Sequence, residues 1–209
     1  MSEIMSDKVE AYMDGLLPKR GAVLAGMERY AKKHDVPIIG PACGRLLSLL
    51  AQISGAKRIY EMGSAIGYSA IWFASGAGEG ATIYCTDGDP ANAKLAQQNF
   101  ERAGVADRIR FLVGDALELL DTVSGVFDLI LIDVSKHQYP AALKKAFPRL
   151  RSGGLIVTDN VLWSAKVASS AKDEDTRAIQ QFNKAIYGSD ELFPVIVPLR
   201  DGVAVCRKT

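Results

Sequence analysis

The fold of this 209-residue chain can be inferred from one segment, Arg58-Ile59-Tyr60-Glu61-Met62-Gly63-Ser64-Ala65-Ile66-Gly67-Tyr68-Ser69. Its first five residues form a short apolar run of the kind that makes a buried strand. Two glycines follow, and the spacing of apolar residues over 68–76 is helical. A strand that passes through a glycine turn into a helix is typical of a crossover unit between parallel strands.

The same alternation continues along the chain. Further apolar runs occupy 82–86, 109–113, 127–132 and 154–158, and helix-like segments occupy 90–103, 115–122 and 139–150. This order predicts a doubly wound α/β fold whose mostly parallel sheet is covered on both faces. The tail differs, because 193–197 and 202–206 are joined by a short turn and predict an antiparallel hairpin at one edge.

The N-terminal part of the chain predicts a helical extension, since residues 5–54 carry apolar residues at helical spacing. A chain of this length fits one domain. We therefore expect a single domain over 1–209, with N-terminal helices in 1–54 and the α/β core in 55–209.

Composition excludes several classes of protein. A net charge of +1 argues against a nucleic-acid binder that relies on a broad basic face. Residues 1–20 have no apolar signal region, and no segment approaches the roughly 20 apolar residues of a membrane span. The three scattered cysteines predict free thiols in a reducing compartment. We expect a cytoplasmic protein that binds neither membrane nor nucleic acid.

Polar residues follow the predicted strands at the ends where ligands of such sheets sit. These residues are Glu61 with Gly63, Asp87, Asp115, Asp133, and Asp159 with Asn160. Every predicted strand outside the tail hairpin therefore ends in an acidic group. Chance placement does not account for a pattern repeated five times.

The glycine turn after the first strand favours a nucleoside without a pyrophosphate. Gly63 and Gly67 let the backbone turn tightly, but Ala65 stands where a dinucleotide site needs its second glycine. Glu61 would repel a diphosphate and suits a cationic or amino group. A simple tight turn is the alternative interpretation of the two glycines.

The next two strand ends suit the rest of a nucleoside. Asp87 can accept hydrogen bonds from both hydroxyls of a ribose, and Asp115 can accept one from an adenine amino group. A helix N-cap is the alternative role for Asp115, because Glu118 stands at the capping-box position. The two roles are compatible.

The last two parallel strands predict a metal site. Adjacent strands would bring together the oxygens of Asp133, Asp159 and Asn160. Two carboxylates and an amide suit Mg²⁺, with Mn²⁺ or Ca²⁺ as alternatives, and only His137 is near enough to suggest zinc. The alternative is a loop start in which Asp159 and Asn160 bond to nearby backbone.

Lys136 follows Asp133 by three residues. It is either a surface lysine at a helix start or a general base. Burial beside a divalent cation disfavours the ammonium form, which is the direction that a base needs.

Seven motifs in this order resemble one family over about residues 20–209. They are V-P-I-I-G-P-A-C-G (36–44), E-M-G-S-A-I-G-Y-S (61–69), C-T-D-G-D-P (85–90), V-G-D-A (113–116), L-I-D-V-S-K-H-Q-Y (131–139), G-G-L-I-V-T-D-N-V-L-W (153–163) and L-R-D-G-V-A-V-C-R (199–207). The family is the cation-dependent class I O-methyltransferases, the group of catechol and caffeoyl-CoA O-methyltransferases and their bacterial relatives. Any one motif is weak, and the ordered set is strong.

The resemblance implies a Rossmann-like methyltransferase domain with a seven-stranded sheet, and a homodimer. It also implies roles for individual residues. S-adenosyl-methionine would be held by Glu61, Gly63, Ser69, Asp87, Asp115, Ala116 and Asp133, with the backbone of Ile39. The metal ligands would be Asp133, Asp159 and Asn160, the catalytic residues Lys136 and Asp133, and the acceptor contacts Lys136, Asn160 and Trp163. The acceptor would be a small vicinal-diol aromatic of the catechol or caffeoyl type.

Three departures from the family pattern bear on the acceptor. Ser135 stands where the family often has an aspartate, and Arg45 replaces a common glutamine. The tail segment 193–198 lacks the glutamate with which animal catechol enzymes hold their substrate. The acceptor must therefore be oriented differently from that in the animal enzymes, and the sequence does not identify it.

Other functions fit parts of the pattern. A nicotinamide-dependent oxidoreductase shares the sheet and Asp87, but Ala65 and the three oxygen ligands argue against it. A methyltransferase acting on RNA, protein or another small molecule, and a non-catalytic sensor of S-adenosyl-methionine, are the remaining alternatives. The near-neutral charge argues against RNA.

Overall fold

The predicted strand, glycine turn and helix are present in the computed structural model of the protein, which describes residues 4–209. Strand β1 spans Arg58–Met62 and helix α4 spans Tyr68–Ala77. Gly67 precedes the helix with φ +84°, and a Cβ at this position would lie 2.4 Å from the ring of Phe100. Both the backbone angle and the close approach require glycine here.

The chain divides into two compact units, Leu17–Ser124 and a second that joins the residues up to Leu16 to Gly125–Thr209. Residues 1–3 of the predicted N-terminal extension lie outside the described residues. The prediction of a single domain over 1–209 stays a prediction.

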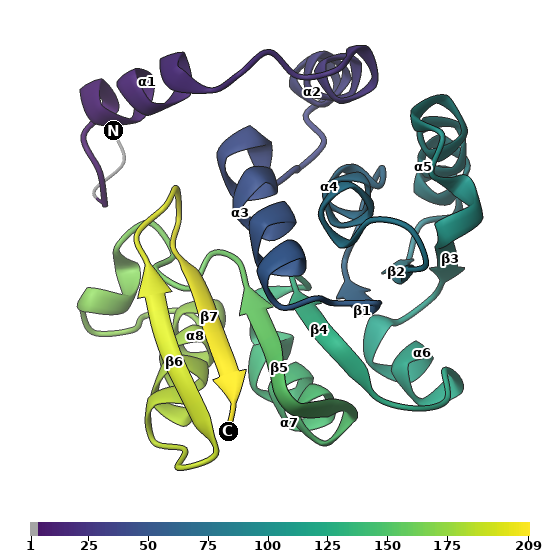
Figure 1. Cartoon of the computed structure of the whole chain (residues 1–209). Helices are drawn as coiled ribbons and strands as arrows, with labels where there is room; N and C mark the ends of the chain where they lie inside the picture. Colours follow the sequence, from purple (N-terminus) through teal and green to yellow (C-terminus); the bar gives the residue numbers. More distant parts are fainter. Residues whose placement is uncertain (1–3) are drawn as a thin grey trace. The chain divides into compact units, whose positions relative to one another are not determined.

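The Leu17–Ser124 unit contains three parallel strands in the order β3-β2-β1. Helices α4 and α5 contact β2, and α6 contacts β1 and β2, so the strands are covered by the helices that connect them. The elements of this unit, labelled in Figure 1, are α2 (Ala22–His34), α3 (Gly40–Ile53), β1, α4, β2 (Thr82–Asp87), α5 (Pro90–Ala103), β3 (Ile109–Val113) and α6 (Ala116–Thr122), with a 3₁₀-helix at Ala106–Arg108.

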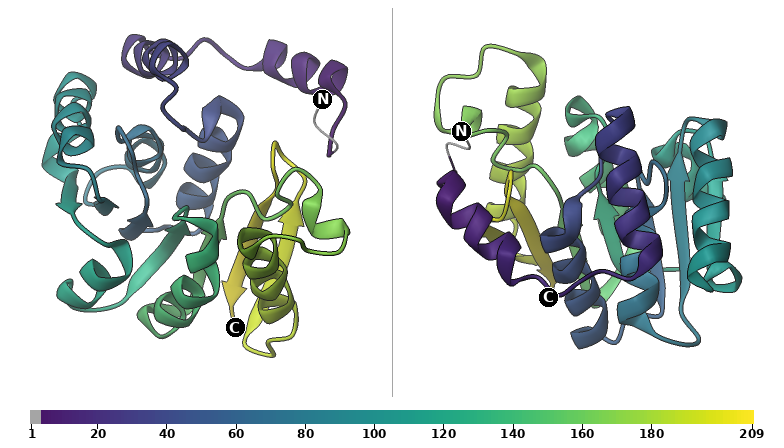
Figure 2. Two further views of the ribbon diagram at one scale, coloured as in Figure 1. Left: turned by 180° about the vertical axis from the view of Figure 1, so that it is seen from behind. Right: turned by 90° about the horizontal axis from the view of Figure 1, so that it is seen from above.

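The second unit contains four strands in the order β4-β5-β7-β6. β4 and β5 are parallel, whereas β7 is antiparallel to both β5 and β6. Helices α7 and α8 pack against each other and cover one face of these strands (Figure 2). The elements are α1 (Asp7–Leu16), β4 (Phe127–Ile132), α7 (Tyr139–Arg149), β5 (Leu150–Thr158), α8 (Glu174–Tyr187), β6 (Leu192–Val197) and β7 (Val203–Lys208), with 3₁₀-helices at Lys136–Gln138 and Lys166–Ala168.

The predicted fold class is confirmed: residues 4–209 form a mostly parallel, seven-stranded α/β fold whose C-terminal strands are antiparallel. Two local differences are found. Helix α8 was not predicted, and β5 begins four residues before the predicted start because Leu150 already pairs with Phe127 across an irregularity in the register. Over the described residues, none of the helices has the length and apolar character needed to cross a membrane.

Candidate functional site

The β1–α4 turn brings together three of the residues predicted to bind a cofactor. The hydroxyl of Ser69 donates a hydrogen bond to the carboxylate of Glu61, and both side chains are buried. The backbone N–H of Gly63 donates to Thr86 Oγ1 at 3.3 Å, and this hydroxyl donates to the Glu61 carbonyl at 2.9 Å. These bonds fix the turn against β2, so Glu61 and Ser69 are held in place before any ligand binds.

Asp87, at the end of β2, accepts hydrogen bonds through both carboxylate oxygens. Oδ2 accepts from the N–H of Ala65 at 3.0 Å, and Oδ1 accepts from the N–H of Asp89 at 2.9 Å and from Asn92 Nδ2 at 3.0 Å. The carboxylate therefore fastens the glycine turn to the loop after β2. Carboxylate oxygens have several lone pairs, so these bonds leave capacity for a ligand hydroxyl.

Asp115 forms the helix N-cap that the capping-box pattern suggests. Its Oδ1 accepts from the N–H groups of Leu117 at 2.8 Å and Glu118 at 3.0 Å at the start of α6. The carbonyl of the neighbouring Ala116 accepts from the Tyr60 hydroxyl at 2.9 Å, and Ile39 is buried just before α3. A bond from Asp115 to an adenine stays a prediction.

Lys136, in the other unit, is at the centre of the predicted metal site. Its Nζ donates to Asp133 Oδ1 at 3.0 Å, to Asn160 Oδ1 at 2.8 Å and to the Tyr139 hydroxyl at 2.8 Å. Only 13% of the side chain is exposed. The side chain is therefore mostly buried, unlike a solvated surface lysine, and its role as a general base stays a prediction.

Asp159 is a buried carboxylate beside a second one. Burial raises its pKa to about 6, and the charge of Asp133 acts in the same direction, while Arg200 and the N–H of Asn160 oppose it. Burial, and after it the charges of Asp133 and Asp159, raises the pKa of Tyr139, whose hydroxyl donates to the Asp159 carbonyl at 2.8 Å. Tyr139 is a site residue that the sequence interpretation missed, although its place three residues after Lys136 was a signal.

The loop after β5 has a strained backbone. Asn160 adopts φ +57°, and Trp163, Ser164 and Ala165 adopt φ +48°, +50° and +61°. Runs of such residues are uncommon outside functional sites. The ring of Trp163 has Lys136 Nζ 5.9 Å from its centroid and Lys166 Nζ at 5.2 Å. Within residues 4–209, its buried Nε1 has no hydrogen-bond partner.

The oxygen donors of this unit fit a divalent cation. Two carboxylates and one amide are the hard ligands that Mg²⁺ and Ca²⁺ prefer. Among the described residues, no cluster of three or more His, Cys, Asp and Glu side chains is placed to hold a metal ion. Lys136 Nζ bonds to two of these three side chains, so the site already accommodates a cation.

Comparison with known proteins gives one consistent result. A family model described as O-methyltransferase matches residues 20–209. A catechol O-methyltransferase from Mycobacterium tuberculosis is 35% identical over 176 residues, which cover 83% of this chain and 80% of that protein.

Solved structures agree with this match. The O-methyltransferase from Bacillus cereus in complex with SAH has a TM-score of 0.88 and 28% identity, with 97% of both chains covered. The O-methyltransferase TomG of Streptomyces achromogenes, in complex with SAM, has a TM-score of 0.89 and 26% identity, with 98% of this chain and all of that one covered.

Proposed function

This chain belongs to the O-methyltransferase family, and we propose that it transfers the methyl group of S-adenosyl-methionine to one hydroxyl of a small vicinal-diol aromatic, with a divalent cation bound. Family membership sets aside the nicotinamide-dependent alternative. The observation that carries the metal-dependent part is the position of Lys136 Nζ, bonded to Asp133 and Asn160 beside the buried Asp159.

The methyl-donor half of the proposal rests on the Leu17–Ser124 unit. Glu61 and Ser69 would face the amino-acid end of the donor, Asp87 the ribose, and Asp115 the adenine. The related Bacillus cereus and Streptomyces achromogenes structures were solved with SAH and SAM, which supports this assignment. When bound, the donor supplies an electrophilic methyl group on a sulfonium sulfur.

The metal half rests on Asp133, Asp159 and Asn160. A divalent cation, when bound, would supply a Lewis acid that lowers the pKa of an acceptor hydroxyl. Asp159 supports the assignment, because burying its negative charge beside that of Asp133 is unfavourable in the protein alone. The positive charge of a bound cation would make this arrangement favourable. Mg²⁺ is the first candidate, with Mn²⁺ and Ca²⁺ as alternatives.

Lys136, in its neutral amine form, would take the acceptor proton at Nζ and become an ammonium. A general base must lie within hydrogen-bond reach of the atom that it deprotonates, and it contributes about 10²- to 10⁴-fold to the rate. The Tyr139 hydroxyl, 2.8 Å from Nζ and itself bonded to the Asp159 carbonyl, would hold the amine in position. In this proposal Lys136 is the general base, and Tyr139 is a positioning residue that orients Lys136 Nζ.

An aromatic acceptor suits the side chains beside the lysine. The Trp163 ring would form one wall of the acceptor site, and its buried Nε1 offers a hydrogen-bond donor. The Mycobacterium tuberculosis relative is named a catechol O-methyltransferase, which also supports a vicinal diol. The expected homodimer stays part of this proposal, and the mass of the protein in solution would test it.

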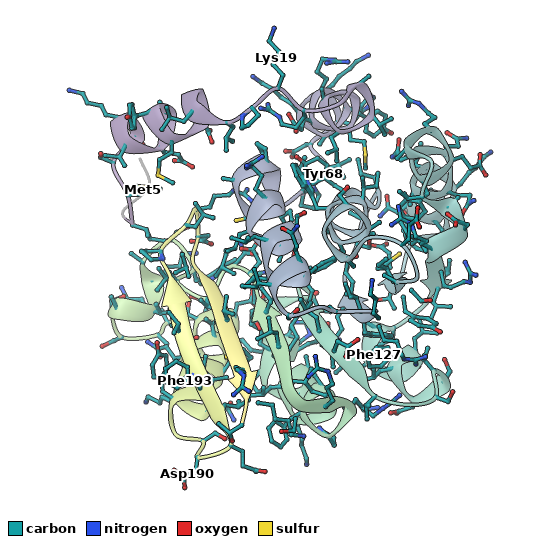
Figure 3. The ribbon with its side chains drawn as sticks, viewed as in Figure 1. Met5, Lys19, Tyr68, Phe127, Asp190 and Phe193 are labelled. Carbon is teal, nitrogen blue, oxygen red and sulfur yellow. The ribbon has the colours of Figure 1, made fainter. Side chains whose placement is uncertain are left out.

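The decisive experiment is methylation of caffeate by the purified protein, with product regiochemistry determined by mass spectrometry and NMR. We expect turnover with Mg²⁺, loss of turnover in EDTA, and recovery when Mg²⁺ is added back. Asp159→Ala should lose turnover, whereas Asp190→Ala should keep it. Asp190 lies just before the start of β6 (Figure 3), so it is at the opposite end of the strands from Asp159, which follows the end of β5.

Full activity in EDTA would overturn the metal assignment. Failure to methylate any of a series of vicinal-diol aromatics, in a protein that still binds S-adenosyl-methionine, would overturn the acceptor class while leaving the donor assignment standing.

A further inference from the structure

A cavity lies within the Leu17–Ser124 unit, between helices α2 and α5. Its volume is about 320 Å³, which is at the lower end of the range for small-molecule sites. The α5 wall is one helix face, with Leu95, Gln98, Asn99 and Arg102 at spacings of three and four residues. None of the residues assigned above to methyl transfer lines this cavity, so it needs an explanation of its own.

Two guanidinium groups lie beside Gly26, a residue of the cavity lining; Arg102 also lines the cavity, and Arg29 lies next to it. The Nη2 atoms of Arg29 and Arg102 each lie 3.9 Å from the position that a Cβ on Gly26 would occupy. Across residues 4–209, neither arginine forms a hydrogen bond or an ion pair. Both side chains are exposed. Two unpaired guanidinium groups beside one point can bind a single oxyanion together, because each can donate two parallel hydrogen bonds to a carboxylate or phosphate.

The nearest acidic side chain on α2 is already engaged elsewhere. Glu28 forms an ion pair with Arg20 at 2.9 Å and accepts a hydrogen bond from the Tyr68 hydroxyl at 2.7 Å. Figure 3 shows Tyr68 just below α2. No acidic residue lines the cavity in the described part of the chain, so the charge of the two arginines is not neutralised within it.

The cavity also has an apolar lining. Met27 and Ile66 are buried contributors, and Leu95 adds a half-buried aliphatic side chain. Asn99 Nδ2 donates to the Ile66 carbonyl at 3.2 Å, which fixes this part of the lining. At the rim, the ring of Tyr30 stacks on His34 with centroids 4.3 Å apart, so an aromatic surface is already in place.

We propose that the α2–α5 cavity binds a small organic anion, namely an apolar or aromatic ring that carries a carboxylate or a phosphate. The oxyanion lies between Arg29 and Arg102, and the ring lies against Met27, Leu95 and Tyr30. The positive charge of the two arginines favours an anionic ligand, and the apolar lining favours a ligand with an apolar or aromatic ring. The site is separate from methyl transfer and does not depend on the function proposed above.

The full-length protein, with its methionine methyl groups ¹³C-labelled, provides a local test. The probes are phenyl phosphate, benzoate, inorganic phosphate and the neutral benzyl alcohol, each titrated while the Met27 methyl resonance is followed. We expect a saturable shift at Met27 with phenyl phosphate or benzoate, and binding about tenfold weaker or worse with benzyl alcohol, which lacks the charge. Inorganic phosphate should also bind more weakly, because it lacks the ring.

Matched variants assign the binding to the cavity. Arg29→Gln with Arg102→Gln should weaken phenyl phosphate binding at least about tenfold, whereas Lys33→Gln with Lys94→Gln, the same charge change on the same two helices outside the cavity lining, should leave it unchanged. Gly26→Leu should abolish binding by filling the mouth, since a Cβ there meets only the flexible arginine ends. Circular dichroism would check that each variant is folded.

Equal binding of benzyl alcohol and phenyl phosphate would overturn the proposal, and so would unchanged binding in the double arginine variant. A shift confined to Met62, at the end of β1, would place the anion elsewhere in the protein and have the same consequence. If inorganic phosphate binds as tightly as phenyl phosphate, the organic class of ligand is wrong.

Discussion

The two sets of acidic residues at the strand ends differ in how their charges are satisfied. In the Leu17–Ser124 unit, Asp87 accepts three N–H hydrogen bonds and Asp115 accepts two, all from nearby residues of the chain. In the other unit, Asp159 is 4% exposed beside Asp133, and Lys136 Nζ bonds to Asp133 and not to Asp159. Asp87 and Asp115 therefore stabilise the turn after β1, the loop after β2 and the start of α6.

The second set carries charge that the fold alone does not fully compensate. A buried carboxylate is costly unless it is paired, and a neighbouring carboxylate increases the cost. Such an arrangement persists where function requires it. The comparison therefore indicates that the first set mainly stabilises the fold, whereas the second set carries an unfavourable charge, which agrees with the cation site and proton transfer proposed above.

The largest effect is expected from Lys136→Met, which keeps the length of the side chain and removes Nζ. Turnover should fall by about 10² to 10⁴, the range for a lost general base, while S-adenosyl-methionine affinity measured by calorimetry stays unchanged. Lys144→Met, an exposed lysine on α7, is the matched control and should keep full activity. An unchanged pH–rate profile in Lys136→Met would show that another residue is the base. The second set of acidic residues would then have no part in proton transfer.

A smaller effect, on stability, is expected at Asp159. Because the folded-state pKa is raised to about 6, above the ordinary value of 3.8, the folded protein holds this proton more tightly than the unfolded chain does. This contribution is present below about pH 4 and is lost as the pH rises through 6. Without metal, Asp159→Asn should therefore be more stable than wild type by about 2 to 3 kcal/mol at pH 7.5.

Urea denaturation in EDTA at pH 4 and at pH 7.5 measures this difference, and the comparison of the two proteins cancels the other titrating groups. Addition of Mg²⁺ at pH 7.5 should stabilise wild type more than the variant. If the two proteins have the same stability at both pH values, the buried charge of Asp159 is not unfavourable. The two sets of acidic residues would then not differ in how their charges are satisfied.

The sequence predicted the parts of the fold that depend on local pattern. The buried strands appear as apolar runs, and the Asp115 cap appears as a capping box. Helix α8 also had a local signal that the interpretation missed, namely Asp173 capping Thr176, followed by Ile179, Phe182 and Ile186 at helical spacing. The early start of β5 had none, because it depends on pairing between Leu150 and the distant Phe127.

The site shows the same division. Its residue types and strand ends were predictable, since parallel strands present their carboxyl ends at one edge. The bond from Lys136 to Asn160 was not, because it joins residues 24 positions apart through a strained loop with φ +57° at Asn160. The contact of Tyr139 with Lys136 was not predictable either, because Tyr139 is buried by packing against Phe182 of α8, a helix that was not predicted.

The smallest effect is expected at Asp115, and its sign is opposite to that at Asp159. Asp115→Ala removes the cap of α6 and should cost about 1 kcal/mol of unfolding free energy, whereas Asp115→Asn should cost only a few tenths because asparagine caps equally well. Thermal unfolding at pH 7.5 would measure both. If Asp115→Asn is as destabilised as Asp115→Ala, the negative charge matters more than the cap. Destabilisation at Asp115 together with stabilisation at Asp159 would establish that one set of carboxylates supports the fold and the other opposes it.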